Sequence, residues 1–283
     1  MLKGLSLDVQ AGESFCIVGP NGAGKSTAVD IFLGLLAPDG GEVALLGRDP
    51  AKGRAKLFQE VGVQFQRNAF YPRVTPVEGL RAHAALYDRP QDPDRLLAAL
   101  GLDRCASTRY MHLSGGERRR LHVALALMGS PRIAFLDEPS SGLDPQAQRA
   151  LWEGLDGLRA EGLTLVFTTH NMREAEQNAD RVGLLLNGRA ALIGPPSALI
   201  RERGFPSCVE GELPDERSAA DAAMQPPASA LRVDRTSRHV RLYGEGADFE
   251  ADGLTWLRDR GCSAVSVRAT GLEDLFFLES QTP

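Results

Sequence analysis

The chain is poor in the residues that would cross-link it or anchor it in a bilayer. Four cysteines occur in 283 residues, far apart and without a C-x-x-C pair. This spacing excludes a dense disulfide framework and favours a reducing cytoplasm. No run of about 18 apolar residues is present, so no membrane-spanning helix is encoded. No signal peptide opens the sequence. Any role at a membrane is therefore expected to come through a partner protein.

Lysine is also scarce. The four lysines are Lys3, Lys25, Lys52 and Lys56, and acidic residues exceed basic ones to give a net charge of -5. This balance argues against a general nucleic-acid-binding surface, so no nucleic-acid partner is expected. With 43% hydrophobic and 24% charged residues, the composition is that of an ordinary globular protein. The length suggests about two domains.

One lysine lies in a glycine-rich stretch that fits the phosphate-loop pattern G-x-x-x-x-G-K-[ST]. An apolar run that predicts a buried strand precedes it, and a predicted helix follows. Glycines allow close backbone approach to phosphates, and the helix N-terminus adds positive potential. We expect Lys25 to reach the β- and γ-phosphates of a nucleotide, Ser26 to ligate Mg²⁺ and Thr27 to donate to a phosphate oxygen. The predicted phosphate-binding residues are Gly19, Pro20, Asn21, Gly22, Ala23, Gly24, Lys25, Ser26 and Thr27.

The remaining pattern up to residue 204 predicts an α/β core domain. Residues 2–9 alternate apolar and polar side chains, which predicts a half-exposed strand. Residues 67–130 contain helical stretches and are interpreted as an inserted helical subdomain. Further strands are predicted at 42–46, 61–66, 133–138, 163–167, 181–186 and 189–193. The last two are separated by Asn187-Gly188, a strong hairpin signal.

A second domain is predicted over residues 205–283. Residues 205–230 are polar and rich in alanine and proline, which predicts a loosely ordered connection. Residues 231–277 regain alternation and predict a small α+β accessory domain. Its role is left open: it is either functional or an appendage that stabilises or dimerises the protein.

Two carboxylates, Asp137 and Glu138, end the strand predicted at 133–138. Open α/β sheets bind ligands at the carboxyl ends of their strands. Asp137 is expected to hold Mg²⁺, directly or through water, and Glu138 to polarise the attacking water as general base. Taken alone, such a pair is equally typical of a solvated strand end. Beside a phosphate loop, it favours a cation site.

Three further motifs complete a recognisable set. Gln66 lies at a strand end, Leu113-Ser114-Gly115-Gly116-Glu117 lies at a predicted helix N-terminus with Ser114 as its cap, and His170 follows a strand. With the phosphate loop and the carboxylate pair, the chain resembles the nucleotide-binding subunit of an ATP-binding-cassette (ABC) transporter. The resemblance covers residues 2 to 203, with every core motif in the family's order. It implies a P-loop NTPase core with ATP and Mg²⁺ as cofactors.

The resemblance also implies roles for single residues. Two copies of the cassette would face each other, with ATP between the phosphate loop of one and Ser114, Gly115 and Gly116 of the other. Gln66 matches the family's Q-loop, which senses Mg²⁺ or the attacking water and reports to the membrane subunit; Gln64 is the alternative register. His170 matches the switch histidine at the γ-phosphate, and residues 141–144 resemble the D-loop at the dimer interface. The catalytic set so implied is Glu138, His170 and Gln66, and the metal-binding set is Ser26, Gln66 and Asp137.

The chain departs from the family pattern in two places. The family has a strand and an adenine-stacking aromatic residue ahead of the position of Leu2, and neither is in this sequence. Either the start was mis-assigned, the chain is truncated, or adenine is held otherwise. Glu117 replaces the more usual glutamine of the signature, which we expect to be tolerated because Ser114 and the backbone do the binding.

The ending 271–278 is similar to that of cassettes from bacterial drug-resistance and polysaccharide export systems, in which the cassette is a separate chain. The resemblance thus implies an ATPase that powers a separate membrane permease, in an exporter, at the cytoplasmic face of the cell membrane. One alternative is a soluble ABC ATPase acting on DNA or ribosomes. The acidic charge and the lack of coiled coils, paired zinc cysteines and a second cassette argue against it. Another alternative is a non-catalytic regulatory cassette, against which the intact Asp137-Glu138 pair argues.

Overall fold

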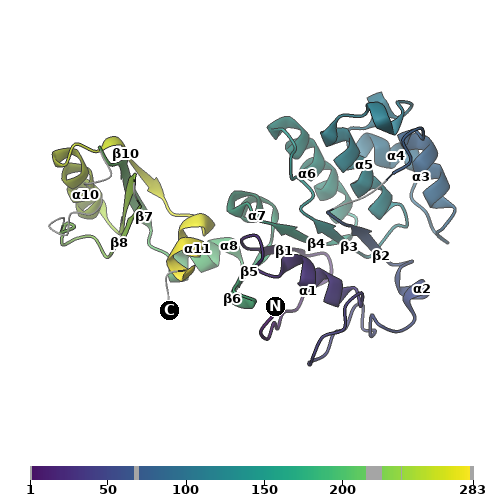
Figure 1. The fold of residues 1–283 in the computed structure, drawn as a ribbon, viewed down its shortest axis with the longest axis horizontal. Helices are drawn as coiled ribbons and strands as arrows, with labels where there is room; N and C mark the ends of the chain where they lie inside the picture. Colours follow the sequence, from purple (N-terminus) through teal and green to yellow (C-terminus); the bar gives the residue numbers. More distant parts are fainter. Residues whose placement is uncertain (1, 67–69, 215–224, 237, 281–283) are drawn as a thin grey trace. The chain divides into compact units, whose positions relative to one another are not determined.

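The computed structural model describes residues 2–66, 70–214, 225–236 and 238–280. Two compact units divide the chain between Pro195 and Pro196, and each is described here by itself (Figure 1). The domain boundary expected from composition, between residues 204 and 205, stays a prediction about sequence organisation.

The first unit is built on a sheet whose described strands have the order β2-β3-β4-β1-β5-β6. The first five run parallel, and β6 is antiparallel to β5. The strands are β1 (Ser14–Val18), β2 (Val61–Gln64), β3 (Ile133–Asp137), β4 (Thr164–Thr169), β5 (Arg181–Leu186) and β6 (Arg189–Gly194). All residues of β1, β3 and β4 are buried, as expected of central parallel strands covered on both faces. The predicted α/β fold is confirmed.

Helices cover both faces of this sheet (Figure 1). Helix α1 (Lys25–Phe32) contributes Val29 to an apolar cluster that also contains Phe15 and Phe135. Helix α5 (Gly115–Leu127) lies on the opposite face and packs on β2. The other helices of this unit are α2 (Arg54–Leu57), α3 (Pro76–Ala84), α4 (Pro93–Ala99), α6 (Pro145–Arg159) and α7 (Met172–Asn178), with short 3₁₀ turns at Asp103–Cys105 and Tyr110–His112.

The helical subdomain predicted at 67–130 is present in its described part, residues 70–130. Thr75 caps α3 and Ser114 caps α5, and each is in a capping box with the glutamate three residues later. The hairpin of β5 and β6 also forms as predicted. Asn187 and Gly188 both have positive φ, 49° and 82°, which a two-residue type I′ turn requires.

Two predicted strands of the first unit are wrong. Residues 2–9 form no ladder with a neighbouring strand, although the amide of Lys3 donates to the carbonyl oxygen of Gly188 at 2.7 Å, and 42–46 form only an isolated bridge from Leu45 to Arg48. Alternation selects which side chains face inward, but a strand also needs a neighbouring backbone to bond, and the two segments do not pair with each other.

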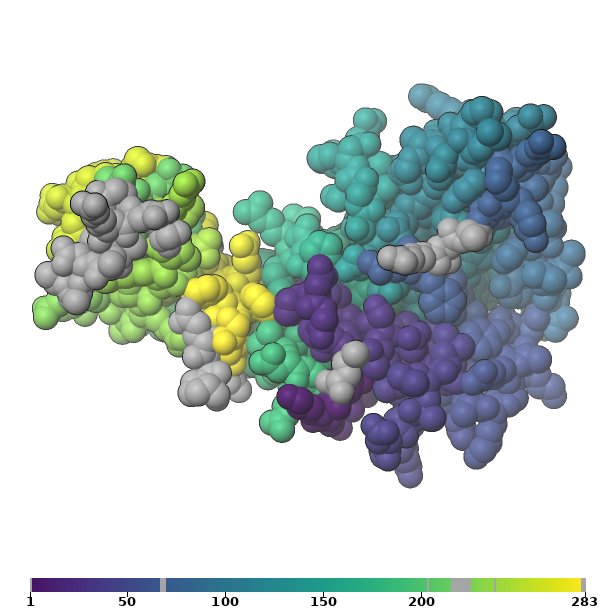
Figure 2. Space-filling view, in the orientation of Figure 1, coloured from purple at the N-terminus to yellow at the C-terminus, as the bar shows by residue number. Residues whose placement is uncertain are grey.

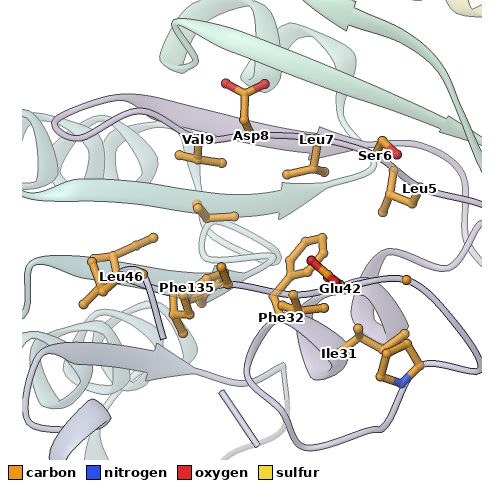
Figure 3. Close-up of a pocket in the computed structure, with 18 of the residues that line it drawn as sticks. Leu5, Ser6, Leu7, Asp8, Val9, Ile31, Phe32, Glu42, Leu46 and Phe135 are labelled. Carbon is orange, nitrogen blue, oxygen red and sulfur yellow. The ribbon is translucent and has the colours of Figure 1, made fainter. Parts of the chain in front are cut away.

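Between these two segments lies a cavity of about 1000 Å³. Leu5, Leu7 and Val9 point into it toward Phe32 and Phe135, while Asp8 points away (Figure 3). In the space-filling view these N-terminal residues, in dark purple, lie at the surface of the first unit (Figure 2). The apolar side chains of residues 2–9 therefore face inward as the alternation predicts, but the backbone of this segment forms no sheet.

The second unit contains a described antiparallel sheet of order β10-β7-β9-β8. Its helix α10 packs on one face through Phe249 and Leu257, which contact Val209 and Leu242. The elements are α8 (Pro196–Arg203), β7 (Ser207–Glu212), β8 (Arg232–Arg235), β9 (His239–Gly244), α10 (Ala247–Asp259), β10 (Ser263–Ala269) and α11 (Leu272–Ser280). The predicted α+β character is confirmed.

The expectation of a loosely ordered connection over 205–230 is wrong for its first part. Residues 207–212 form β7, a central strand of the second sheet, because Cys208 and Val209 are buried on its two faces. Residues 215–224 of that stretch lie outside the described residues.

Candidate functional site

The phosphate loop follows β1 at the carboxyl edge of the parallel sheet. At Gly19 any side chain would collide with the carbonyl oxygen of Leu185. Gly22 and Gly24 have φ of 80° and 106°, in the left-handed region that favours glycine. The glycines of the motif are thus required by a backbone that turns sharply and passes close to β5.

The N-terminus of α1 begins at the end of this loop. Its cap residue is Gly24, which offers no side chain to the first amides of the helix. Uncapped N–H groups and the helix dipole together make an anion site. Lys25 lies over the loop and donates from Nζ to the carbonyl oxygens of Gly19 and Pro20, at 2.8 and 3.1 Å. Burial lowers its pKa, and the nearby Glu138 and Asp137 act in the opposite direction.

The two carboxylates predicted from the sequence lie against this loop. Asp137 ends β3, and its Oδ2 accepts a hydrogen bond of 3.2 Å from Ser26 Oγ. Glu138 follows with φ of 50°, and its Oε1 lies 4.0 Å from Lys25 Nζ. Both carboxylates are buried, so their charges act on the loop with little screening.

Glu138 is the point on which the predicted catalytic side chains converge. His170 Nδ1 lies 3.0 Å from Glu138 Oε1, and Gln66 Nε2 lies 3.4 Å from Glu138 Oε2. The three residues come from the ends of three adjacent strands, β3, β4 and β2. A parallel sheet brings such strand ends to one edge, so residues far apart in sequence meet there.

The signature segment forms the start of helix α5. Ser114 is exposed, and its hydroxyl accepts from the amide of Glu117 in its own helix, at 3.2 Å. Leu143 of the D-loop segment packs at the start of this helix, where a Cβ on Gly116 would lie 3.4 Å from it. Within one copy, the structure therefore brings the signature and D-loop segments together and keeps Ser114 facing solvent.

The two glutamines considered for the Q-loop, Gln64 and Gln66, lie in different environments. Gln64 is 2% exposed at the end of β2 and donates to the carbonyl oxygen of Phe65 at 2.6 Å. Its Oε1 is buried without a partner among the described residues. Gln66 is exposed and reaches Glu138, so Gln66 lies at the carboxylate site and Gln64 lies in the core.

The sequence analysis did not identify the buried residues that hydrogen-bond to the site residues and to their strand. Thr168 contacts both Asp137 and Glu138. The hydroxyl of Thr169 donates to Glu174 Oε2 at 2.5 Å, and Glu174 Oε1 accepts from the indole N–H of Trp152 at 3.2 Å. The available signal was two threonines at the end of a buried strand, where a polar side chain needs a partner.

Comparisons with known proteins identify the family of this chain. A family model described as ABC transporter matches residues 2–141. The chain is 38% identical over 290 residues to a fluoroquinolones export ATP-binding protein of Mycobacterium tuberculosis, covering 97% of this chain and 86% of the relative. It is 41% identical over 296 residues to the Nod factor export ATP-binding protein I of Burkholderia pseudomallei, covering 97% and 93%.

Solved structures show the same fold. One described as the ATP-binding subunit of an ABC transporter matches with a TM-score of 0.64 at 29% identity, covering 71% of this chain and 86% of that chain. A dimeric ATP-binding cassette in a post-hydrolysis state, bound to ADP and Pi, matches with a TM-score of 0.60 at 27% identity, covering 69% and 90%. With its phosphate loop, carboxylate pair and strand-end histidine in one place, the chain belongs to the ABC transporter family, as the ATP-binding and ATP-hydrolysing component of such a transporter.

Proposed function

We propose that this chain binds and hydrolyses ATP to power a separate membrane permease that exports its substrate. The observation that carries the proposal is the convergence of Lys25, Glu138, His170 and Gln66 beside an uncapped helix N-terminus. The names of the relatives, which are export ATP-binding proteins, support the direction of transport.

The donor set at the phosphate loop fits Mg²⁺. Ser26 Oγ and Asp137 Oδ2 are hard oxygen donors placed side by side. Among the described residues no cluster of three or more His, Cys, Asp or Glu could hold a metal. One carboxylate and one hydroxyl suit an ion that completes its shell with water and nucleotide phosphates. Bound there, Mg²⁺ would neutralise charge on the β- and γ-phosphates.

The chain's own residues would supply positioning and proton transfer. Lys25 would exchange its contacts to Gly19 and Pro20 for phosphate oxygens, and the amides of the loop would cradle the same group. Glu138 would accept a proton from the attacking water, with His170 and Gln66 setting the orientation of its carboxylate. Gln66 is further proposed as a metal-sensing residue.

A second copy of the chain would complete the nucleotide site. Ser114, Gly115 and Gly116 form the N-terminus of α5, where Ser114 and Gly115 are exposed and the hydroxyl of Ser114 accepts within its own helix. A dimer related by a two-fold axis would set each signature segment against the partner's phosphate loop.

The permease partner is expected to be a separate chain. No helix in the described ranges of the sequence is long and apolar enough to cross a membrane. From the names of the relatives, export ATP-binding proteins, we infer that the protein works at the cytoplasmic face of the cell membrane, held there by the permease.

The test is the substitution Glu138→Gln, which removes the proton acceptor and keeps the shape of the side chain. We expect ATP binding to persist and turnover to fall by about 10²- to 10⁴-fold, the range of general-base contributions. Phosphate release and equilibrium nucleotide binding would be measured on the same preparation. The matched control is Glu60→Gln, which removes a carboxylate that pairs with Arg48 and Arg132 away from the loop.

Unchanged hydrolysis in Glu138→Gln would overturn its assignment as base. A pull-down with the tagged variant and ATP, from detergent-solubilised membranes, separates the transporter from its rivals. Recovery of a polytopic membrane protein supports the proposal. Recovery of ribosomes or DNA alone, with ATP binding intact, supports the soluble alternative.

A further inference from the structure

Thr168 lies near the end of β4, the strand between β3 and β1, and has no exposed surface. The register of the parallel strands sets it directly opposite Asp137. Its hydroxyl contacts both residues of the carboxylate pair: Oγ1 bonds to Asp137 Oδ1, and it accepts from the backbone N–H of Glu138 at 3.1 Å.

The direction of these two hydrogen bonds follows from counting protons. A threonine hydroxyl has one proton to donate and two lone pairs that accept. Because the Glu138 N–H occupies a lone pair, the single proton is free for Asp137 Oδ1. Asp137 Oδ1 is thereby tied down, and Oδ2 is the oxygen left facing Ser26 Oγ at 3.2 Å.

The Thr168 hydroxyl also bonds to the backbone of Glu138, which has an uncommon conformation. Glu138 has φ of 50°, in the left-handed region that a residue with a Cβ adopts at a cost. Its amide also donates to the carbonyl oxygen of Thr168, at 3.2 Å. Both acceptors for this amide therefore belong to Thr168. One residue of the adjacent strand thus holds the turn that directs the Glu138 side chain toward Lys25.

We propose that Thr168 is the positioning residue of this site: its hydroxyl turns Asp137 Oδ2 toward the Mg²⁺ position and fixes the backbone that carries Glu138. The inference rests on the roles proposed above for Asp137 and Glu138. Groups behind a metal ligand fix its orientation, and their loss weakens metal affinity by about 10- to 100-fold.

The chain provides a matched control on the same strand. Thr164, at the other end of β4, is also buried and accepts a backbone amide, that of Gly12 at 2.9 Å. Thr168→Val and Thr164→Val therefore each remove a threonine hydroxyl from a buried position on the same strand. Thr168→Ser keeps the hydroxyl and Thr168→Ala removes it, and this second pair carries the test if valine at 168 prevents folding.

The readout is the Mg²⁺ dependence of ADP binding by the full chain, measured by calorimetry, because ADP is not consumed. We expect Thr168→Val and Thr168→Ala to raise the half-saturating Mg²⁺ concentration by about tenfold or more. Thr164→Val and Thr168→Ser should match the wild type, and ADP affinity without Mg²⁺ should be the same in all variants. At saturating Mg²⁺, turnover of Thr168→Val should still be reduced because the Glu138 turn has lost an acceptor.

Two results would overturn the proposal. If Thr168→Val requires no more Mg²⁺ than Thr164→Val, the hydroxyl does not orient Asp137. If Thr168→Ser behaves like Thr168→Ala, side-chain volume and not the hydroxyl matters. Asp137→Asn distinguishes the levels of failure: if it leaves the Mg²⁺ requirement unchanged, the metal site of the proposed function fails and the role of Thr168 fails with it.

Discussion

At the scale of single residues, the structure distinguishes residues proposed to contact nucleotide or Mg²⁺ from residues that hold those side chains in place. Lys25, Ser26, Asp137 and Glu138 carry polar or charged groups, and the motifs that contain them predicted the site. Thr168 and Glu174 lie outside these motifs, and the position of Thr168 at the end of a buried strand is a weak signal because buried threonines and glutamates occur for many reasons. Only their contacts with Asp137 and Thr169 identify them as supports.

His122 gives a prediction at this scale, in the helical subdomain. Burial lowers its pKa to about 4, with the positive charge of Arg119 acting in the same direction, and its ring contacts Tyr110 and Phe70. The folded protein therefore keeps His122 neutral at a pH where the unfolded chain, with an ordinary pKa near 6.5, takes up a proton. The titration of His122 does not lower the free energy of unfolding above a pH of about 6.5, and it lowers that free energy progressively as the pH falls toward 4.

We expect His122→Phe to show a shallower loss of stability between pH 7.5 and 5.0 than the wild type. Urea unfolding would be followed through Trp152 fluorescence in a Trp256→Phe background, so that only the first unit reports. The same substitution at the exposed His112 serves as the control. Parallel pH dependence in His122→Phe and the wild type would contradict the assignment.

At the scale of elements, local signals were strong where a helix begins. Thr75 and Ser114 both precede a glutamate by three residues, and both form capping boxes. Capping depends on neighbours in sequence, so it can be predicted from sequence. Strands 2–9 and 42–46 failed for the opposite reason, since pairing depends on a segment elsewhere in the chain.

The two caps allow a prediction that separates structure from function. Ser114→Ala and Thr75→Ala each remove a hydroxyl that accepts the amide three residues on, at 3.2 and 3.4 Å, and each should cost about 1 kcal/mol of stability. Only Ser114→Ala should also lower ATP hydrolysis, since Ser114 is proposed to contact nucleotide on the partner copy.

Thermal unfolding and steady-state ATPase rates on the two variants check both parts. Equal ATPase rates in Ser114→Ala and Thr75→Ala would contradict a role for Ser114 beyond capping.

At the scale of the whole molecule, the question is whether the second unit unfolds separately from the first. Asp274, 2% exposed, accepts from Arg268 at 2.7 and 2.9 Å and from the hydroxyl of Tyr243 at 3.2 Å. Burial acts to raise its pKa, but hydrogen bonds from Arg268 and the Gly271 amide hold that pKa below its ordinary value. The ionised Asp274 carboxylate thus stabilises the fold at pH values above its pKa in the unfolded chain. This contribution is lost as the pH falls through its pKa in the folded protein.

We expect Asp274→Asn to destabilise the second unit by about 3 kcal/mol, the lower end for breaking a buried pair, because Arg268 reaches solvent. Faster hydrogen exchange should be confined to residues 196–283. Glu273→Gln, at the exposed neighbour, should change little. Faster exchange throughout residues 2–195 in Asp274→Asn would show that the two units do not unfold separately.

The sequence by itself determined the chemistry of the nucleotide site and most elements of the parallel sheet. A phosphate loop, a buried strand ending in carboxylates and a capped helix are local patterns, and they persist in any context that buries their apolar face. The tertiary structure decided how these pieces are joined. It placed Gln66 at Glu138 and Gln64 in the core, although the two differ by two residues in sequence.

Tertiary contacts also made 207–212 a central strand within a stretch expected to be loose. They left 2–9 without a strand ladder and brought Thr168 into contact with both Asp137 and Glu138. Each of these outcomes depends on hydrogen-bond partners that are distant in the chain. Composition and periodicity report which side chains prefer burial, but the register of neighbouring strands decides which polar groups meet.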